Sequence, residues 1–291
     1  MHQLAFLGYR LCNLLVPEEP RAFSVVTATG TWNFEQDQNY VRWKDAIVTK
    51  GACAITYSIS TDVGIAGSRA SAIDAAPEEL LAICLGCSFL NAMAVRPVQD
   101  LPASEVMFVS VGDHFPRARS MGAGWPLCNT LADFRVGLES FVRSYGAVEQ
   151  SEKARLLVHH WIDALAFWSL EDLTLSTTTV LEIIAATAER LGRIAGKNLT
   201  SFAQRIDYAA DRFNLPHLPA TFRKMRNDLV HEGHLSGSRF PQKSLDECAE
   251  AVREALDWID QYMCAVFGLG QPSAKRFNKN AFLGANAFSL N

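Results

Sequence analysis

The chain has 291 residues, of which 49% are hydrophobic and 20% are charged. This length and composition are typical of a folded protein with a large core and about two domains. The formal net charge is −4, and residues 1–150 carry 11 Lys and Arg against 15 Asp and Glu, while residues 151–291 carry 16 of each class. Proteins that coat nucleic acid nonspecifically have a basic excess, so we expect any contact with RNA to be local.

The amino terminus lacks the basic start and small-residue cleavage site of a secretory signal. The longest apolar run, residues 80–90, is too short to cross a bilayer, so we expect no membrane association. Seven cysteines, an odd number, predict reduced thiols in a cytoplasmic protein. Cys84 and Cys87 form a C-x2-C pair, but no second pair accompanies them. We therefore expect core packing here, and assign no metal and no cofactor.

The first part of the chain has the features of β-structure. Strand signals, which are β-branched and aromatic residues or an alternation of apolar and polar positions, occur in residues 24–30, 39–50 and 53–59. A helix is expected to open at Pro77, and residues 105–112 are expected to form a further buried strand. The basic loop 114–119 is a candidate for ligand or RNA contact, or an ordinary surface loop. Residues 1–130 are thus predicted to form a β-rich domain for sensing or recruitment.

The pattern turns helical after residue 130. Helices are predicted over residues 151–168, 177–195, 202–213, 219–233 and 244–268. Ser244-Leu-Asp-Glu247 has the spacing of a capping box for the last of them. Residues 269–291 show no helical or strand period and are predicted to be a mobile tail. The expected fold class is α+β, with the β-rich domain followed by an all-α helical bundle over residues 131–268.

The segment between Phe222 and Gly233 is the part of the chain that suggests chemistry. Phe222, Met225 and Leu229 fall at i, i+3 and i+7, which is one face of a helix, so the polar residues project from the other face. Asn227 and His231 are one turn apart. Arg226 lies about 140° around the helix from His231.

A histidine exchanges protons near neutral pH, and an arginine presents a planar cation that suits phosphate oxygens. His231 and Arg226 together fit cleavage of a phosphodiester without a metal, although the same spacing also occurs on ordinary solvated helices. Asn227 either holds the imidazole or makes a local hydrogen bond. Three neighbouring basic residues are candidates for substrate binding, or equally for a solvated face: Arg223, Lys224 and His234.

Arg226-Asn-Asp-Leu-Val-His231 resembles the R-x4-H signature of HEPN domains. The segment Thr179–Leu191, with its Leu181-Glu182 pair, is similar to an early core helix of the Apea-like HEPN branch, so the resemblance covers about residues 150–268. It implies an all-helical HEPN-like bundle that forms a homodimer with a composite site for RNA cleavage. His231 would handle protons there, and Arg226 would stabilise charge on the phosphate.

The resemblance implies a metal-independent endoribonuclease that serves as a toxin or anti-phage defence effector, with a phage-derived trigger or an inhibitory partner. The alternative is a noncatalytic HEPN-like module that dimerises or binds a nucleotide while the N-terminal domain senses a ligand. Both hypotheses predict a dimer, and they differ in the role of His231. Glu182 and Glu189 either line the site or form structural ion pairs with arginines such as Arg226.

Overall fold

The computed structural model describes residues 4–64, 69–98, 124–241, 244–270, 272, 275–279 and 281–282. The chain separates into two compact units, Met1–Gly146 and Ala147–Asn291. The expected strand at 105–112 and the basic loop 114–119 lie outside the described residues. The fold class is α+β, as predicted, because an antiparallel sheet in the first unit is followed by a helical unit.

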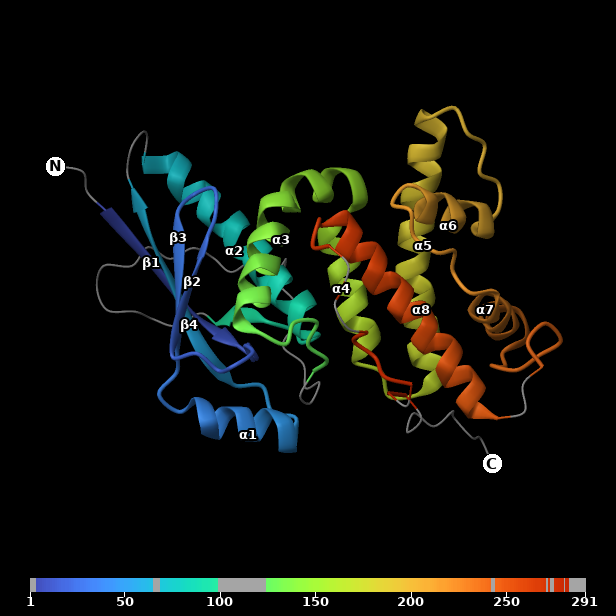
Figure 1. Ribbon diagram of the computed structural model, residues 1–291, viewed down its shortest axis with the longest axis horizontal. Helices are drawn as coiled ribbons and strands as arrows, with labels where there is room; N and C mark the ends of the chain where they lie inside the picture. Colours follow the sequence, from blue (N-terminus) through green and yellow to red (C-terminus); the bar gives the residue numbers. More distant parts are fainter. Residues whose placement is uncertain are drawn as a thin grey trace. The chain divides into compact units, whose positions relative to one another are not determined.

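A five-stranded sheet lies in the first unit (Figure 1). Its strands are β1 (Leu4–Cys12), β2 (Ala22–Val26), β3 (Thr31–Gln36), β4 (Ile55–Gly64) and β5 (Arg96–Val98), in the spatial order β2-β3-β4-β1-β5. Every pairing is antiparallel. Phe23 pairs with Phe34, which pairs in turn with Ile59, and all three are buried. One face of the sheet is therefore the core face of this unit.

Residues 40–50, which we predicted to be a strand, instead form helix α1 (Tyr40–Lys50). Tyr40 and Ile47 are its buried residues, and this spacing of seven fits two turns of helix. Gly51, with φ of 61°, closes the helix in the left-handed conformation, and its N–H reaches Ala46 O and Ile47 O. The β-branched content of the segment was misleading because a helical period and a C-terminal glycine override a weak strand preference.

Helix α2 (Arg69–Asn91) begins earlier than expected, so Pro77 lies inside it. Cys84 and Cys87 are fully buried on this helix, and burial raises the pKa of both thiols. All seven cysteines are free, and the C-x2-C pair packs in the core, as predicted.

Helix α3 (Leu131–Glu152) begins in the first unit and not in the helical one. Its Phe134 ring lies 6.1 Å from that of Phe23, and Phe141 lies 6.5 Å from Phe89. These aromatic contacts explain why the division falls after Gly146, later than the predicted boundary at residue 130.

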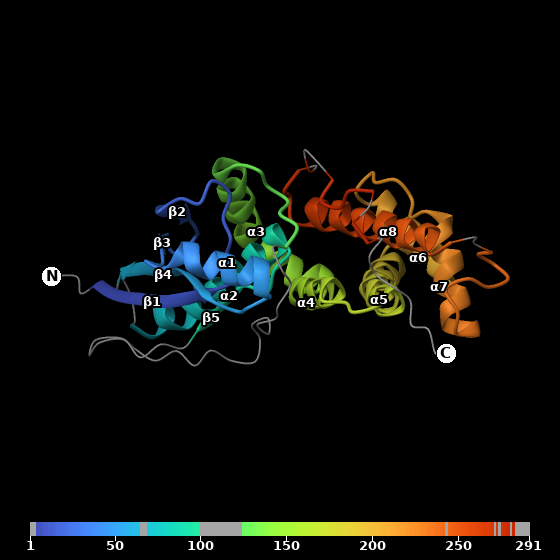
Figure 2. The ribbon, with the colours of Figure 1, turned by 90° about the horizontal axis from the view of Figure 1, so that it is seen from below.

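The second unit consists of the end of α3 and five further helices: α4 (Ala154–Leu165), α5 (Leu170–Ile194), α6 (Phe202–Asp211), α7 (Ala220–Glu232) and α8 (Leu245–Val266). Helix α5 is the central element, because it packs against α4, α6, α7 and α8. It lies alongside α8 in both views (Figures 1 and 2). Its buried stripe includes Leu181, Ile184 and Ala188.

The predicted capping box at the start of α8 does not form. Ser244 has the extended backbone of an N-cap, but its side chain makes no cap hydrogen bond. A capping box occurs instead on α6, where Gln204 N donates to Ser201 Oγ and Ser201 N donates to Gln204 Oε1. The sequence pattern marked the start of α8 correctly but not the contact that caps it.

The described part of the tail packs onto the helical unit, whereas we expected a mobile segment. Phe277 and Phe282 are buried, and the Phe282 ring lies 5.6 Å from that of Phe167. The Arg276 side chain is fully buried, donates from Nε to Asp260 Oδ2 at 2.8 Å and stacks on the Trp161 ring. Two isolated aromatic residues and one arginine supply no period, so the sequence pattern did not show this packing.

The buried Arg276–Asp260 pair gives a pH-dependent prediction. Burial raises the pKa of Asp260 to about 6, above the usual value of about 3.9, although Arg276 acts to lower it. The stability that comes from proton binding at Asp260 is therefore present at low pH and lost as the pH rises through about 6. Arg276→Ala should lower the free energy of unfolding by about 3–5 kcal/mol at pH 8, since it leaves a buried charge unpaired. The loss should be smaller at pH 5, where Asp260 becomes protonated.

Urea unfolding followed by circular dichroism at both pH values measures this difference. Arg193→Ala is the matched control, because Arg193 also forms an ion pair, with Glu189, but its side chain is 78% exposed. Equal losses of unfolding free energy in the two variants would show that the buried pair contributes no more to stability than the exposed pair.

Candidate active site on helix α7

Helix α7 forms where the sequence predicted a helix, and it buries the predicted face. It follows Pro219 and ends at Gly233, whose φ of 77° is left-handed. Phe222, Met225 and Leu229 are buried. The polar residues of the R-x4-H pattern therefore lie on the flank and the outer face of this helix.

The Arg226 guanidinium is held by contacts from three helices. Its Nη2 donates to Glu182 Oε1 on α5, and its Nη1 donates to Asn227 Oδ1 at 3.0 Å. It also lies over the Phe202 ring of α6, 4.6 Å from the ring centroid. The Nε is buried and makes no hydrogen bond with the described residues. Arg226 is thus fixed in orientation, with one donor unpaired.

Glu182 and Glu189 both serve as ion-pair partners, which was one of the two roles expected for them. Glu182 binds Arg226, while Glu189 binds Arg193 and Arg205, each at 3.0 Å. Two arginines that follow α5 in the sequence, one on α6 and one on α7, are therefore tied to successive carboxylates of α5.

His231 lies on the exposed face of α7, and no hydrogen bond or ion pair joins it to another described residue. At about 100° per residue, Asn227 lies between His231 and Arg226 around the helix. Asn227 Oδ1 accepts from Arg226, so the local contact is the one that forms, and Asn227 does not hold the imidazole. The Asn227 amide instead helps to fix the orientation of the Arg226 guanidinium.

The three expected substrate-binding residues have different surroundings. Arg223 is half-buried, and its Nη1 lies 3.6 Å from Asp207 Oδ1 on α6. Lys224 is exposed on the same outer face as His231, and His234 is exposed just beyond the helix. Lys224 and His231 lie about 20° apart around the helix and about two turns apart along it, so they share one exposed face, whereas Arg223 has a structural partner.

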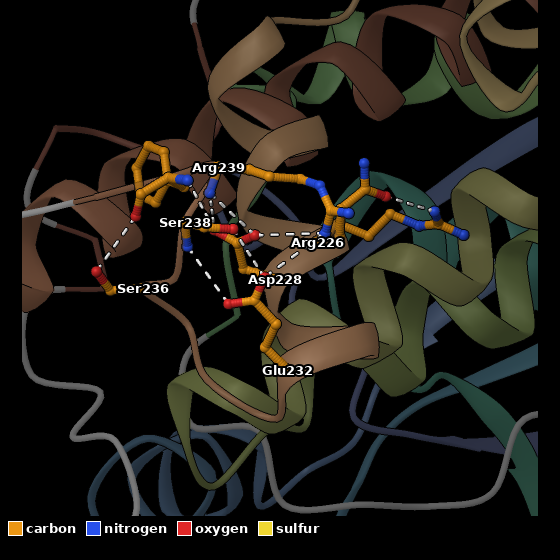
Figure 3. Close-up of polar contacts among 8 residues, drawn as sticks. Arg226, Asp228, Glu232, Ser236, Ser238 and Arg239 are labelled. Carbon is orange, nitrogen blue, oxygen red and sulfur yellow. Dashed lines mark hydrogen bonds and ion pairs between the residues drawn. The ribbon is translucent and has the colours of Figure 1, made fainter.

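Asp228 has a role that the sequence analysis missed. Its carboxylate is fully buried and accepts from the backbone N–H groups of Arg239 and Phe240, the latter at 2.7 Å. One turn later, Glu232 accepts from the Ser238 hydroxyl at 2.9 Å (Figure 3). These two carboxylates hold the loop after α7 against the end of the helix, next to the turn that carries His231.

Gly237 permits this close approach. A Cβ at this position would lie 2.8 Å from Asp228 Cγ and 2.4 Å from Glu232 Oε2, which is too close for ordinary contact. The signal in the sequence was the i, i+4 spacing of Asp228 and Glu232 before a loop rich in glycine and serine. From the sequence alone, such a pair is typical of a solvent-exposed helix face, because the folding of the loop back onto the helix is not encoded in the spacing.

Among the described residues, no group of three or more His, Cys, Asp or Glu side chains is placed to hold a metal ion. None of the helices in the described part of the chain is long and apolar enough to span a membrane. Comparison with protein-family models, curated proteins and solved structures gives no match. The resemblance to HEPN domains therefore rests on the quoted residues of α5 and α7.

Replacing Asp228, the buried carboxylate that accepts from the loop after α7, should loosen that loop. Asp228→Asn keeps the size of the side chain but removes its charge and one acceptor, so we expect a loss of about 1–3 kcal/mol in the free energy of unfolding. The amides of Arg239 and Phe240 should exchange with deuterium faster than in the unaltered protein. Glu232→Gln is the control, since Glu232 is 36% exposed and should matter less. Unchanged exchange at both amides in Asp228→Asn would contradict this role.

The loop before α7 provides a test of local electrostatics. The hydrogen bond that His217 Nε2 donates to Asp211 Oδ1 at 2.9 Å, and then the charge of Asp207, raise the pKa of His217 above its usual 6.5. Any stability that the His217–Asp211 pair contributes is present below about pH 6.5. It is lost as the pH rises through the pKa that His217 has in the folded protein. NMR titration of the His217 ring should show the raised pKa, and Asp211→Asn should lower it. The exposed Asp246→Asn serves as the control and should leave the His217 titration unchanged.

Proposed function

We propose that the helical unit is a metal-independent endoribonuclease that acts as a homodimer, with His231 and Arg226 at its site. The observation that carries this proposal is the contrast between the two residues on one helix. Arg226 is fixed by Glu182, Asn227 and Phe202, whereas His231 is exposed. An oriented cation and an accessible proton-transfer group on one helix suit phosphodiester chemistry at a site that a second protomer completes.

In the proposed reaction, the imidazole of His231 takes the proton of a ribose 2′-hydroxyl. The resulting oxygen attacks the adjacent phosphorus, and the bond to the 5′-oxygen breaks. A protonated histidine, supplied by the second protomer, gives a proton to that leaving oxygen. The products are a 2′,3′-cyclic phosphate and a 5′-hydroxyl, and the Arg226 guanidinium stabilises charge on the non-bridging phosphate oxygens.

The cost of placing Arg226 supports a functional role. A buried donor without a partner costs about 1–3 kcal/mol, and the Nε of Arg226 is such a donor. Unsatisfied groups of this kind call for an explanation beyond stability. Lys224, on the outer face with His231, is the best-placed residue for holding the RNA backbone, with His234 beyond the helix end.

The proposal places the protein in the cytoplasm as a toxin or anti-phage defence effector. A composite site gives direct control, because moving two protomers relative to each other would assemble or separate the two histidines. A phage-derived trigger or an inhibitory partner would act at this step.

Loss of either residue should abolish cleavage without unfolding the protein. Purified protein incubated with labelled RNA in EDTA should produce 2′,3′-cyclic phosphate ends. His231→Ala should lower the rate at least about 100-fold, the usual contribution of an acid–base group. Arg226→Ala should also lower it strongly. Both variants should keep the circular dichroism spectrum and the dimer mass of the unaltered protein.

Two matched controls separate chemistry from structure. His217→Gln removes an exposed histidine of the same unit, and Arg205→Ala removes the comparable ion pair between α6 and α5. Both should cleave RNA at the unaltered rate. Intact RNA with the unaltered, dimeric protein, before and after exposure to phage-infected cell extract, would refute the ribonuclease proposal.

The second candidate function is a noncatalytic dimerisation or nucleotide-binding module. The observation that favours it is that Arg226 makes structural contacts with Glu182 and Phe202, while nothing described orients His231. In that case Arg226→Ala and Glu182→Gln should weaken stability or dimerisation to a similar extent. His231→Ala should then change neither RNA nor growth of the expressing cells.

A further inference from the structure

Two of the seven free cysteines line one cavity in the first unit. Cys12 is the last residue of β1, and Cys53 lies two residues before the start of β4. The cavity has a volume of about 710 Å³, which is within the range of small-molecule sites. None of its lining residues belongs to the R-x4-H site, so its chemistry is separate from the ribonuclease proposal.

The backbone makes the two cysteines neighbours on adjacent segments of chain. Cys12 pairs with Ile55 at the end of the β1–β4 ladder. The pairing continues one residue further, since Asn13 N donates to Ala54 O at 2.9 Å and Ala54 N donates to Asn13 Oδ1 at 3.1 Å. Cys53 therefore lies two residues from the partner of Cys12, which is the diagonal position of an antiparallel pair. Cys12, Ile55 and Cys53 all line the cavity, so they lie on the same side of the two segments.

The separation of these positions suits a bond that forms after a small movement. Diagonal neighbours have Cα atoms about 7–8 Å apart, whereas a disulfide needs about 4.4–6.8 Å. Residues 51–54 belong to no helix or strand, and Ala54 N is bonded to the side chain of Asn13 and not to its backbone. The segment that carries Cys53 can therefore approach β1 without a change in the pairing of the strands.

The two thiols differ in access. Cys53 is exposed, so a solute in the cavity can reach it. Cys12 is buried, and burial first, with the charge of Cys53 next, raises the pKa of the Cys12 thiol to about 11, although Arg96 acts to lower it. The influence of Cys53 on this pKa agrees with the short separation of the two sulfurs. Cys53 is thus the thiol that meets an external reagent first, and Cys12 is placed to react after it.

We propose that Cys12 and Cys53 form a disulfide by exchange with a small disulfide, such as oxidised glutathione, that enters this cavity. The Cys53 thiolate attacks one sulfur of the small disulfide, and a first thiolate leaves. The Cys12 thiolate then attacks the Cys53 sulfur of the mixed disulfide, and a second thiolate leaves. The two protons of the cysteines pass to the leaving thiolates. Two protein thiols are thereby oxidised, and one small disulfide is reduced to two thiols.

The bond makes the first unit responsive to the redox state of its surroundings. In a reducing compartment it forms only when the concentration of small disulfides rises, as is usual for redox-sensing cysteines. It closes a loop of chain that contains β2, β3 and α1. Closing a long loop restricts the unfolded chain, so the oxidised protein is the more stable form.

The test incubates the reduced full chain with oxidised glutathione at pH 8, follows its intact mass and locates the bonds by peptide mapping. The unaltered chain should become about 2 Da lighter, with Cys12 joined to Cys53. Its Tm should be higher than that of the reduced chain. A chain that stops with glutathione attached to Cys53, or that does not react at all, would overturn the proposal.

Three variants, each checked for folding by circular dichroism, separate the two steps. Cys12→Ala should stop at the mixed disulfide on Cys53 and become about 300 Da heavier. Cys53→Ser should leave Cys12 unmodified, because Cys12 is buried. Cys128→Ser is the control, since Cys128 is partly exposed and lies outside this cavity, and it should form the same disulfide as the unaltered chain. An internal disulfide in either of the first two variants would show that other cysteines react, and would also overturn the proposal.

Discussion

Two carboxylates on helix α5, seven residues apart, join this central helix to two of the later helices of the second unit. Glu182 binds an arginine of α7, and Glu189 binds an arginine of α6. Since both carboxylates are partly exposed, the pairs add little to stability, and the buried stripe of α5 supplies most of it. The pairs instead add one directional contact from α5 to α7 and one from α5 to α6. The apolar residues that α7 buries, Phe222, Met225 and Leu229, leave His231 and Lys224 on its outer face.

The extent to which the sequence predicts this structure depends on the kind of signal. Helices α6, α7 and α8 follow from their apolar period and end residues, whereas the place of Glu182 on a helix face allowed two roles, of which the ion pair is the one that forms. The residues of α1 carry conflicting signals, since their β-branched composition favours a strand while their apolar period and the closing glycine favour the helix that forms. The loop anchored by Asp228 was missed because it depends on two chain segments meeting, which no local pattern encodes. The contact between Arg226 and Phe202 is of the same kind.

The polar residues on and around α7 fall into two sets: those with a hydrogen-bond or ion-pair partner within the chain, and those that are exposed to solvent. Asp228, Glu232, Arg239 and Arg223 all have partners within the chain. Lys224, His231 and His234 are exposed, and together they form a small polar surface on a unit without a basic excess. Recognition on such a surface would depend on a few well-placed groups, and so on geometry, more than on a general attraction for phosphate.

The buried tail bears on how the helical unit can be prepared in isolation. A fragment that ends at Gly268, where α8 has just finished, would lack Arg276, Phe277 and Phe282. The Asp260 carboxylate would lose its cation, and the rings of Trp161 and Phe167 would lose their cover. Such a fragment would expose a new apolar patch and would tend to self-associate for a reason unrelated to the dimer that we propose. The oligomeric state measured on this fragment would reflect association through the exposed patch. A fragment that extends through Phe282 keeps the patch covered and avoids this artefact.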